Sequence, residues 1–141
     1  AEAITVVDGA MDGLDRVVIE PAKRVSDPEA RLRETIRLHV RGLFDNGLEF
    51  ALLFPERRHL ETTQQKVVLR RIETYLKLLR GAMQELDDEG KLRDLDINIT
   101  ARHILQTIAG IARWYTKDAG VSVDLLVEQT VNFNLSAILK R

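Results

Sequence analysis

Apolar side chains recur every three or four residues along almost the whole of this chain, which is the spacing of an amphipathic α-helix. The pattern begins with Ile4, Val7 and Met11 and returns in every later segment as far as Ile138 and Leu139. Nowhere does it change to the alternation of apolar and polar residues that is typical of a strand ladder. The sequence therefore predicts an all-α fold, an antiparallel bundle of about six helices.

Prolines, glycines and capping side chains divide this pattern into separate helices. Pro21 is expected to interrupt the first helix or to end it shortly before. The run Ser-Asp-Pro-Glu at 26–29 combines a capping side chain with proline at the first helical position, and it predicts the start of the next helix. The expected caps of the later helices are Thr62, with Gln65 at capping-box spacing, then Asn98 or Thr100, and finally Ser122.

Length and charge exclude several classes of function. The 141 residues correspond to one domain, and 21 basic against 22 acidic residues leave a formal net charge of −1. A compact domain that binds DNA by neutralising phosphates normally has a basic excess, so direct DNA binding by this chain is not expected. No apolar run approaches the ~20 residues of a membrane helix, and no secretory signal is recognisable, so we expect a cytoplasmic protein without a membrane partner.

Motifs for catalysis and metal binding are sparse. The chain has no cysteine, which excludes thiolate ligands and cysteine nucleophiles. Glu56 and His59 have the Glu-x-x-His spacing of a carboxylate-bridged metal site, but His39 and His103 do not repeat it. No Gly-x-Ser-x-Gly elbow and no phosphate-binding glycine loop occurs. We therefore predict no catalytic residues, no metal and no cofactor; a small helical enzyme without a recognisable motif is the less favoured alternative.

Of the last two predicted helices, the one between Ala101 and Tyr115 is apolar on more than one face, which indicates two burial partners, and the terminal one mixes polar and apolar residues. Ala109, Gly110 and Ala112 place small residues in the middle of the first of them, where another helix could approach closely. A symmetric homodimer is the economical explanation, and a monomer whose last helical hairpin belongs to the core is the alternative. The expected dimer interface consists of Leu105, Ala109, Ala112, Tyr115, Leu126, Thr130, Phe133, Asn134, Ala137 and Ile138.

Several short segments follow one another in an order that a known family shares. They are FALLFPERRHL at 50–60, Arg70-Arg71 and Tyr75 on a long helix, ITARHIL at 99–105, ARWY at 112–115, and GVS at 120–122 before a terminal helix. In this order they resemble the regulatory domain of TetR-family transcriptional repressors. The same order resembles the subgroup of cholesterol- and fatty-acid-catabolism repressors that respond to acyl-coenzyme A thioesters. The resemblance covers the chain from about Asp27 to its end.

The resemblance implies a division of the chain and a function. Residues 26–141 would form a ligand-binding and dimerisation domain, and residues 1–25 would be the helix that connects it to a helix-turn-helix head. That head is missing from the chain, so DNA would be a partner only through it. The ligand would be a fatty-acyl or steroid-derived coenzyme A thioester or another apolar molecule, and its binding would shift the connecting helix. A helical interaction module without a ligand is the alternative.

The resemblance also implies a pocket among the middle helices, with arginines at the anionic end of the ligand. The expected pocket residues are Leu43, Phe50, Leu53, Phe54, Arg57, Arg70, Tyr75, Leu79, Met83, Ile104, Ile108, Ile111, Arg113 and Trp114.

Overall fold

The computed structural model describes residues 12–45, 61–116 and 120–140. Their helices are η1 (Asp15–Ile19), α2 (Glu20–Lys23), α3 (Pro28–Asp45), α5 (Thr62–Asp88), α6 (Ile97–Trp114) and α7 (Val123–Ile138). This confirms the predicted all-α fold. Extended pairing within the described ranges is limited to an isolated antiparallel bridge between Leu92 and Leu139. None of the described helices is both long and apolar enough to cross a membrane.

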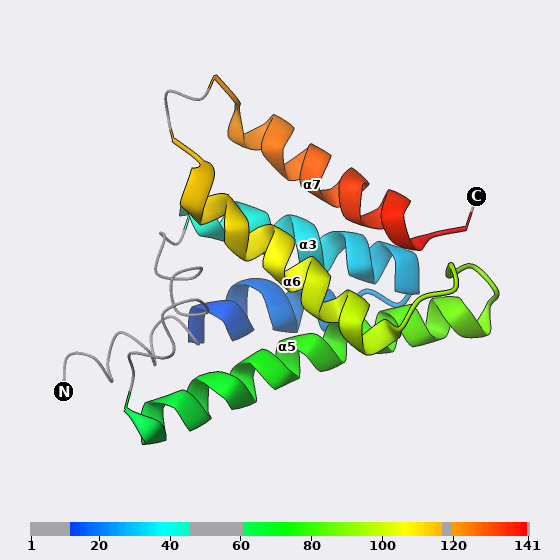
Figure 1. The fold of residues 1–141 in the computed structure, drawn as a ribbon, viewed down its shortest axis with the longest axis horizontal. Coiled ribbons are helices and arrows are strands. Elements are labelled where there is room, and N and C mark those ends of the chain that lie inside the picture. The colour runs from blue at the N-terminus through cyan, green and yellow to red at the C-terminus, as the bar shows by residue number, and fades with distance from the viewer. Residues whose placement is uncertain (1–11, 46–60, 117–119, 141) are drawn as a thin grey trace.

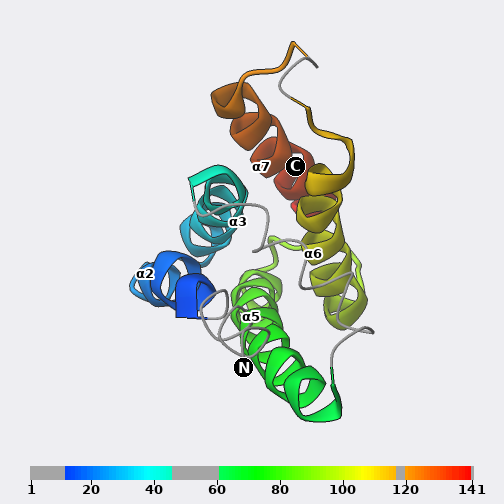
Figure 2. The ribbon, with the colours of Figure 1, turned by 90° about the vertical axis from the view of Figure 1, so that its left-hand side faces the viewer.

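Helix α3 is the centre of the bundle and packs against η1, α2, α5, α6 and α7. In Figure 1, α5 and α7 lie on opposite sides of α3, and α6 crosses between them. Figure 2 views the helices more nearly end-on and shows them arranged around a common interior. The buried apolar side chains of all these helices form one continuous core in that interior.

The connecting helix continues through Pro21 instead of ending before it. Segment η1 is π-helical, and the Glu20 N–H donates to the carbonyl of Asp15, five residues earlier. A proline has no N–H, and its ring crowds the carbonyl four residues before it, so a wider turn ahead of Pro21 relieves the conflict. Helix α2 then continues the connecting helix to Lys23. The buried side chains of the connecting helix are Leu14, Val18, Ile19 and Ala22.

Two of the predicted helix starts are confirmed. The Asp27 carboxylate accepts a hydrogen bond from the Ala30 N–H at 2.9 Å, and α3 begins at Pro28. The Ser122 hydroxyl accepts from the Leu125 N–H at 3.1 Å and caps α7. In both cases a short polar side chain satisfies an N–H group that has no partner inside the helix.

The predicted cap of α5 is wrong by one residue. Glu61 and Gln64 form the capping box, in which the Glu61 N–H donates to Gln64 Oε1 at 3.2 Å. The prediction used Thr62 and Gln65. Adjacent glutamines allow either register, and the observed one also places the Glu61 carboxylate at the positive end of the helix.

The predicted cap of α6 is also wrong. Asp96 is the N-cap, and its carboxylate accepts from the Ile99 N–H at 2.8 Å. Asn98 and Thr100 lie inside the helix instead. An aspartate upstream of both offers a charged acceptor that also interacts favourably with the helix dipole.

The end of α7 is fixed to the connector between α5 and α6. The Arg93 N–H donates to the Ile138 carbonyl and the Lys140 N–H donates to the Lys91 carbonyl, both at 2.8 Å. The Arg93 guanidinium adds a bond to the Leu139 carbonyl at 2.9 Å. Helix α7 is thus held at its C-terminal end and along α3, whereas it makes few contacts with α6.

Candidate functional site

Half of the predicted pocket residues meet in the interior between α3, α5 and α6. Each is at most 3% exposed, and all belong to the core cluster that also contains the buried side chains of the connecting helix. The structure therefore brings these residues together, in a closely packed apolar environment. They are Leu43, Tyr75, Leu79, Met83, Ile104, Ile108 and Ile111.

One polar pair lies in this apolar interior. His39 Nδ1 on α3 and the Tyr75 hydroxyl on α5 are 2.7 Å apart, and both side chains are fully buried. Their rings meet edge to face with centroids 5.0 Å apart. Burial disfavours the charged form of each group: it lowers the pKa of His39 to about 3 and raises the pKa of Tyr75. At neutral pH the interior thus holds two uncharged hydrogen-bonding groups.

His39 was not among the predicted site residues. Its burial could have been predicted from its position on the apolar stripe of α3, three residues after Ile36 and four before Leu43. A histidine on such a stripe faces the core, and an aromatic partner at Tyr75 could not be inferred from sequence spacing because it comes from another helix.

The predicted cationic residues do not join this interior. Arg70 on α5 and Arg113 near the end of α6 are both exposed. Arg71, next to Arg70, forms an ion pair with Asp15 of η1 and so ties the connecting helix to α5. The remaining predictions, Phe50, Leu53, Phe54 and Arg57, lie outside the described residues.

The neighbouring aromatic residues at the end of α6 face in different directions. Tyr115 packs edge-on against Phe44, with ring centroids 4.9 Å apart, and its hydroxyl donates to the Val121 carbonyl at 3.1 Å. Trp114 is 53% exposed and lines a surface groove. The structure therefore places Trp114, predicted in the pocket, on the outer surface, and turns Tyr115, predicted in the dimer interface, towards the chain's own core.

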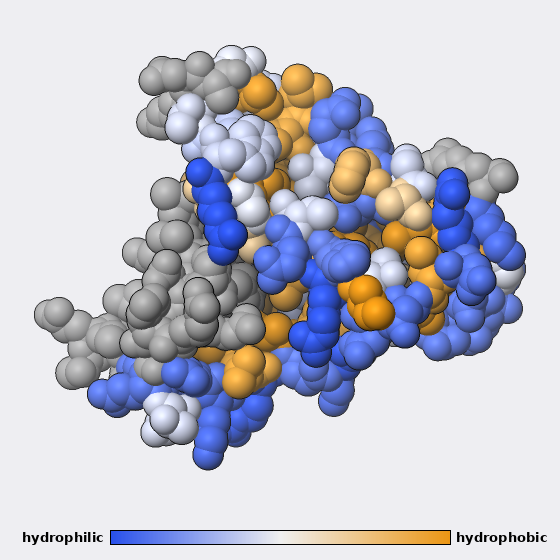
Figure 3. Space-filling model, viewed as in Figure 1, coloured by the Kyte–Doolittle hydropathy of each residue, from blue (hydrophilic) through white to orange (hydrophobic). Residues whose placement is uncertain are grey.

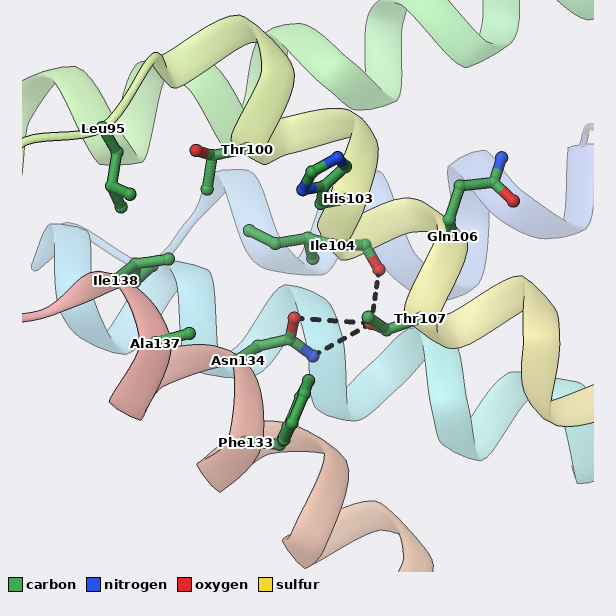
Figure 4. A pocket seen from close by; sticks show the side chains of 10 residues that line it. All are labelled: Leu95, Thr100, His103, Ile104, Gln106, Thr107, Phe133, Asn134, Ala137 and Ile138. Carbon is green, nitrogen blue, oxygen red and sulfur yellow. Dashed lines mark hydrogen bonds between the residues drawn. The ribbon is translucent and has the colours of Figure 1, made fainter.

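The groove that Trp114 lines runs between α6 and α7 as two adjoining hollows of about 570 and 610 Å³. Apolar surface is visible along this side of the molecule in Figure 3, and Figure 4 shows the first hollow from close by. Among the described residues, no Asp, Glu, Lys or Arg lines either hollow, although 30% of the chain is charged. The first is lined by Leu95, Thr100, His103, Ile104, Gln106, Thr107, Phe133, Asn134, Ala137 and Ile138, and the second by Thr107, Ile111, Trp114, Val121, Leu125, Leu126, Gln129, Thr130 and Phe133.

The predicted dimer residues divide between this groove and the core. All those on α7 line the groove: Leu126, Thr130, Phe133, Asn134, Ala137 and Ile138. On α6, by contrast, Leu105 and Ala109 are 5% exposed and Ala112 packs against the core. The open face of α6 instead presents Ile99, His103, Gln106 and Trp114. These residues follow a second three-and-four spacing, which is the sequence signal for this face of α6.

The floor of the groove contains one polar link between α6 and α7 (Figure 4). The Asn134 amide donates to Thr107 Oγ1 at 3.1 Å and to the Thr130 carbonyl at 2.9 Å. The Thr107 hydroxyl in turn donates to the Ile104 carbonyl at 2.7 Å. Asn134 is only 4% exposed, so this link satisfies its buried amide within the chain.

Metal ligands are not grouped in the described part of the chain. His, Asp and Glu side chains within residues 12–45, 61–116 and 120–140 form no cluster of three or more that could hold a metal ion. Glu56 and His59, the pair with metal-ligand spacing, lie outside these ranges.

Several solved structures share this fold. AibR, in complex with isovaleryl coenzyme A and operator DNA, has 20% identity and a TM-score of 0.82, covering 92% of this chain and 71% of that one. KstR2 of Mycobacterium tuberculosis, a ketosteroid transcriptional regulator, has 19% identity and a TM-score of 0.84, covering 96% and 70%. SCO3833 from Streptomyces coelicolor A3, a TetR-family regulator, has 23% identity and a TM-score of 0.80, covering 97% and 69%. At these identities the likeness establishes the fold.

Sequence comparison gives the family. No curated protein sequence matches the chain. The family model described as "Tetracyclin repressor-like, C-terminal domain" matches residues 25–138, which is most of the chain. This protein therefore belongs to the tetracyclin repressor-like C-terminal domain family of TetR transcriptional regulators.

Proposed function

We propose that this domain is the effector-binding and dimerisation domain of its regulator. An apolar ligand enters the interior between α3, α5 and α6, and the connecting helix at residues 12–23 transmits its presence to a DNA-binding head. Operator binding then depends on which placement of the connecting helix the ligand favours. A few kcal/mol of differential affinity between two placements is enough for such control.

The observation that carries this proposal is that the connecting helix and the predicted pocket share one core. Leu14 and Val18 of the connecting helix are at most 1% exposed and belong to the same cluster as Tyr75 and Leu79. Protein interiors are close-packed, so a ligand cannot enter without displacing side chains that support the connecting helix. Ligand occupancy and the placement of this helix are therefore coupled through direct contacts.

The character of the interior supports a ligand with an apolar body. The predicted pocket residues that meet there are apolar apart from Tyr75, which is neutral and hydrogen-bonded to the neutral imidazole of His39. The acyl or steroid part of a coenzyme A thioester suits such a lining. Its phosphates must stay where water or a cation can reach them, and Arg70 and Arg113 are exposed on the surface.

The uncharged α6–α7 groove supports dimerisation. Phe133, Trp114 and Leu125 are each 48–66% exposed there. A contiguous apolar face without charged residues is typical of the core of a protein interface. A second copy of the chain is the economical partner because a two-fold contact uses the same face on both molecules.

Ligand binding is tested by calorimetry and native mass spectrometry with fatty-acyl and steroid-derived coenzyme A thioesters, using free coenzyme A as the reference. At least one thioester should bind more than about tenfold tighter than free coenzyme A, since only the thioesters carry the apolar part. The Tyr75→Phe variant removes the interior hydroxyl and should change that affinity by about tenfold.

The Tyr115→Phe variant is the matched control, because its hydroxyl bonds the Val121 carbonyl away from the interior. It should bind like the wild type. If no thioester binds, or if the two variants behave alike, the interior is not the ligand site, and the chain is a helical interaction module.

A further inference from the structure

We propose that the two-fold axis of the dimer passes beside Phe133 and Thr107, so that the two copies of Phe133 meet at the centre of the interface. This inference rests on the dimer proposed above. It goes further because it fixes the register of the two chains and names the residue that meets itself.

Phe133 and Thr107 lie at the middle of the groove. They are the two residues that line both hollows, so they stand where the hollows adjoin. Phe133 is also 66% exposed, more than any other large apolar side chain in the described part of the chain. In Figure 4 its ring lies beside Thr107 and Asn134, over the polar link between the helices. A large aromatic side chain at the centre of an open apolar face has the usual position of an interface anchor.

A two-fold axis that crosses the groove at this point places the exposed side chains at one end of each copy opposite the hollow at the other end of its partner. The rotation exchanges the two sides of the axis, so the first hollow of each copy faces the second hollow of the other. Trp114 and Leu125 at one end would then cover the hollow beside Leu95 and Ala137 of the second copy. An axis displaced towards either end would leave one hollow of each copy without a partner.

The groove floor can be covered by an apolar group at this point. The Asn134 amide already donates to Thr107 and to the Thr130 carbonyl, and the Thr107 hydroxyl donates to the Ile104 carbonyl. Covering these groups with an aromatic ring leaves no donor unpaired. The ring of Phe133 from a second copy therefore does not require a polar group opposite it.

Helix α6 also permits a close approach at the same level. Gly110 lies three residues after Thr107, and a side chain built there would have nothing within 4 Å. Glycine inside a helix is unfavourable, and no contact within the described part of the chain requires it at this position. A second helix crossing α6 near Thr107 would use that space. Because no Asp, Glu, Lys or Arg of the described residues lines the groove, a copy laid on it meets no like charge from that part of the lining.

Because the chain has no cysteine, single cysteine variants report on the axis directly. A disulfide needs its two Cα atoms within about 7 Å of each other. Only a residue next to a two-fold axis lies that close to the same residue of the second copy. Phe133→Cys should therefore form a covalent dimer under mild oxidation. Leu125→Cys is the matched control, since it is also exposed on this face of α7 but lies eight residues earlier. At 1.5 Å per helical residue, its two copies would be roughly 24 Å apart and should not cross-link.

A charge placed at the axis provides the second measurement. Phe133→Arg brings two like charges together and should raise the dimer dissociation constant more than about tenfold in analytical ultracentrifugation. Leu69→Arg, on an exposed position of α5, is the control and should leave the constant unchanged. Circular dichroism checks that the variants keep the helical fold.

The outcomes separate this inference from the dimer itself. A wild-type chain that sediments as a monomer at all concentrations would overturn both, and the groove would then bind another partner. A wild-type dimer in which Leu125→Cys cross-links and Phe133→Cys does not would overturn the axis alone. Efficient cross-linking through residue 133, together with a weakened Phe133→Arg dimer, would establish it.

Discussion

Replacing His39 by glutamine is expected to remove a large part of the pH dependence of stability between neutral and mildly acidic pH. The imidazole is fully buried beside Tyr75, and burial lowers its pKa to about 3, whereas its ordinary value is 6.5. Between these two values the unfolded chain binds a proton that the folded chain does not. Stability therefore falls as the pH is lowered through this window, and the contribution of His39 is fully present only above pH 6.5.

The size of the effect follows from the same two values. When the imidazole stays neutral in the folded chain, only its protonation in the unfolded chain changes the free energy of unfolding. That free energy falls by about 1.4 kcal/mol for each pH unit below the pKa of the unfolded chain. Between about pH 7.5 and about pH 5 the loss is therefore about 2 kcal/mol. This is a substantial fraction of the ~5–15 kcal/mol by which a domain is stable.

The assay is urea denaturation of the wild type and of His39→Gln across this range, at a fixed protein concentration because dimerisation also affects stability. Carboxylates contribute to the pH dependence of both proteins and cancel in the difference. Leu79→Ala is the control, because it weakens the same core but keeps the imidazole. It should show the pH dependence of the wild type.

Equal pH dependence in the wild type and in His39→Gln would refute the reasoning, since the imidazole would then be as easily protonated in the folded chain as in the unfolded one. If His39→Gln does not fold, the ring signals of His39 in the wild type give the same test by NMR. They should not titrate above about pH 4, and titration near 6.5 would contradict the burial argument.

Two further predictions concern stability. Leu79→Ala should lower the free energy of unfolding by about 2–5 kcal/mol, because Leu79 is fully buried. Leu69→Ala, at a 49% exposed position on the same helix, should change it by less than about 0.5 kcal/mol. Equal losses of the two variants in denaturant titrations would contradict the assignment of Leu79 to the core. Asp96→Ala should cost about 1 kcal/mol by removing the cap of α6, and Asn98→Ala should cost less than half as much; thermal unfolding would show the reverse order if the predicted Asn98 cap were the real one.

Local sequence rules account for the helices but not for their exact starts. The start of α3 and the cap of α7 are predicted correctly, because Ser26 and Asp27 stand directly before Pro28 and Ser122 stands directly before the first residue of α7. At Asp96 several capping side chains compete within a few residues, and the choice depends on where the helix must begin in order to pack. Pro21 lies within a helix for a similar reason: a π-helical turn before it keeps Val18 and Ile19 in the core.

The candidate site shows where periodicity alone stops being informative. An apolar stripe predicts that Tyr75 and Ile104 are buried, and they are. It does not state which of two apolar faces turns inward, and on α6 the interface prediction used the inward face with Leu105 and Ala109. Trp114 shows the same ambiguity, since a large aromatic side chain suits either a core or a partner. Only the packing of α6 against α3 and α5 decides between them.

Helix α6 connects the two proposed functions because it contributes to both sites. Ile108 packs in the interior, Thr107 and Trp114 line the groove, and Ile104 belongs both to the core cluster and to the lining of the first hollow. An α-helix keeps its internal hydrogen bonds when it is displaced, so a ligand that moves the inner face also moves the outer one. Helix α7, by contrast, is fixed to α3 and to the connector before α6. Movement of α6 against a fixed α7 would change the shape of the groove between them, and through it the contact with a second copy.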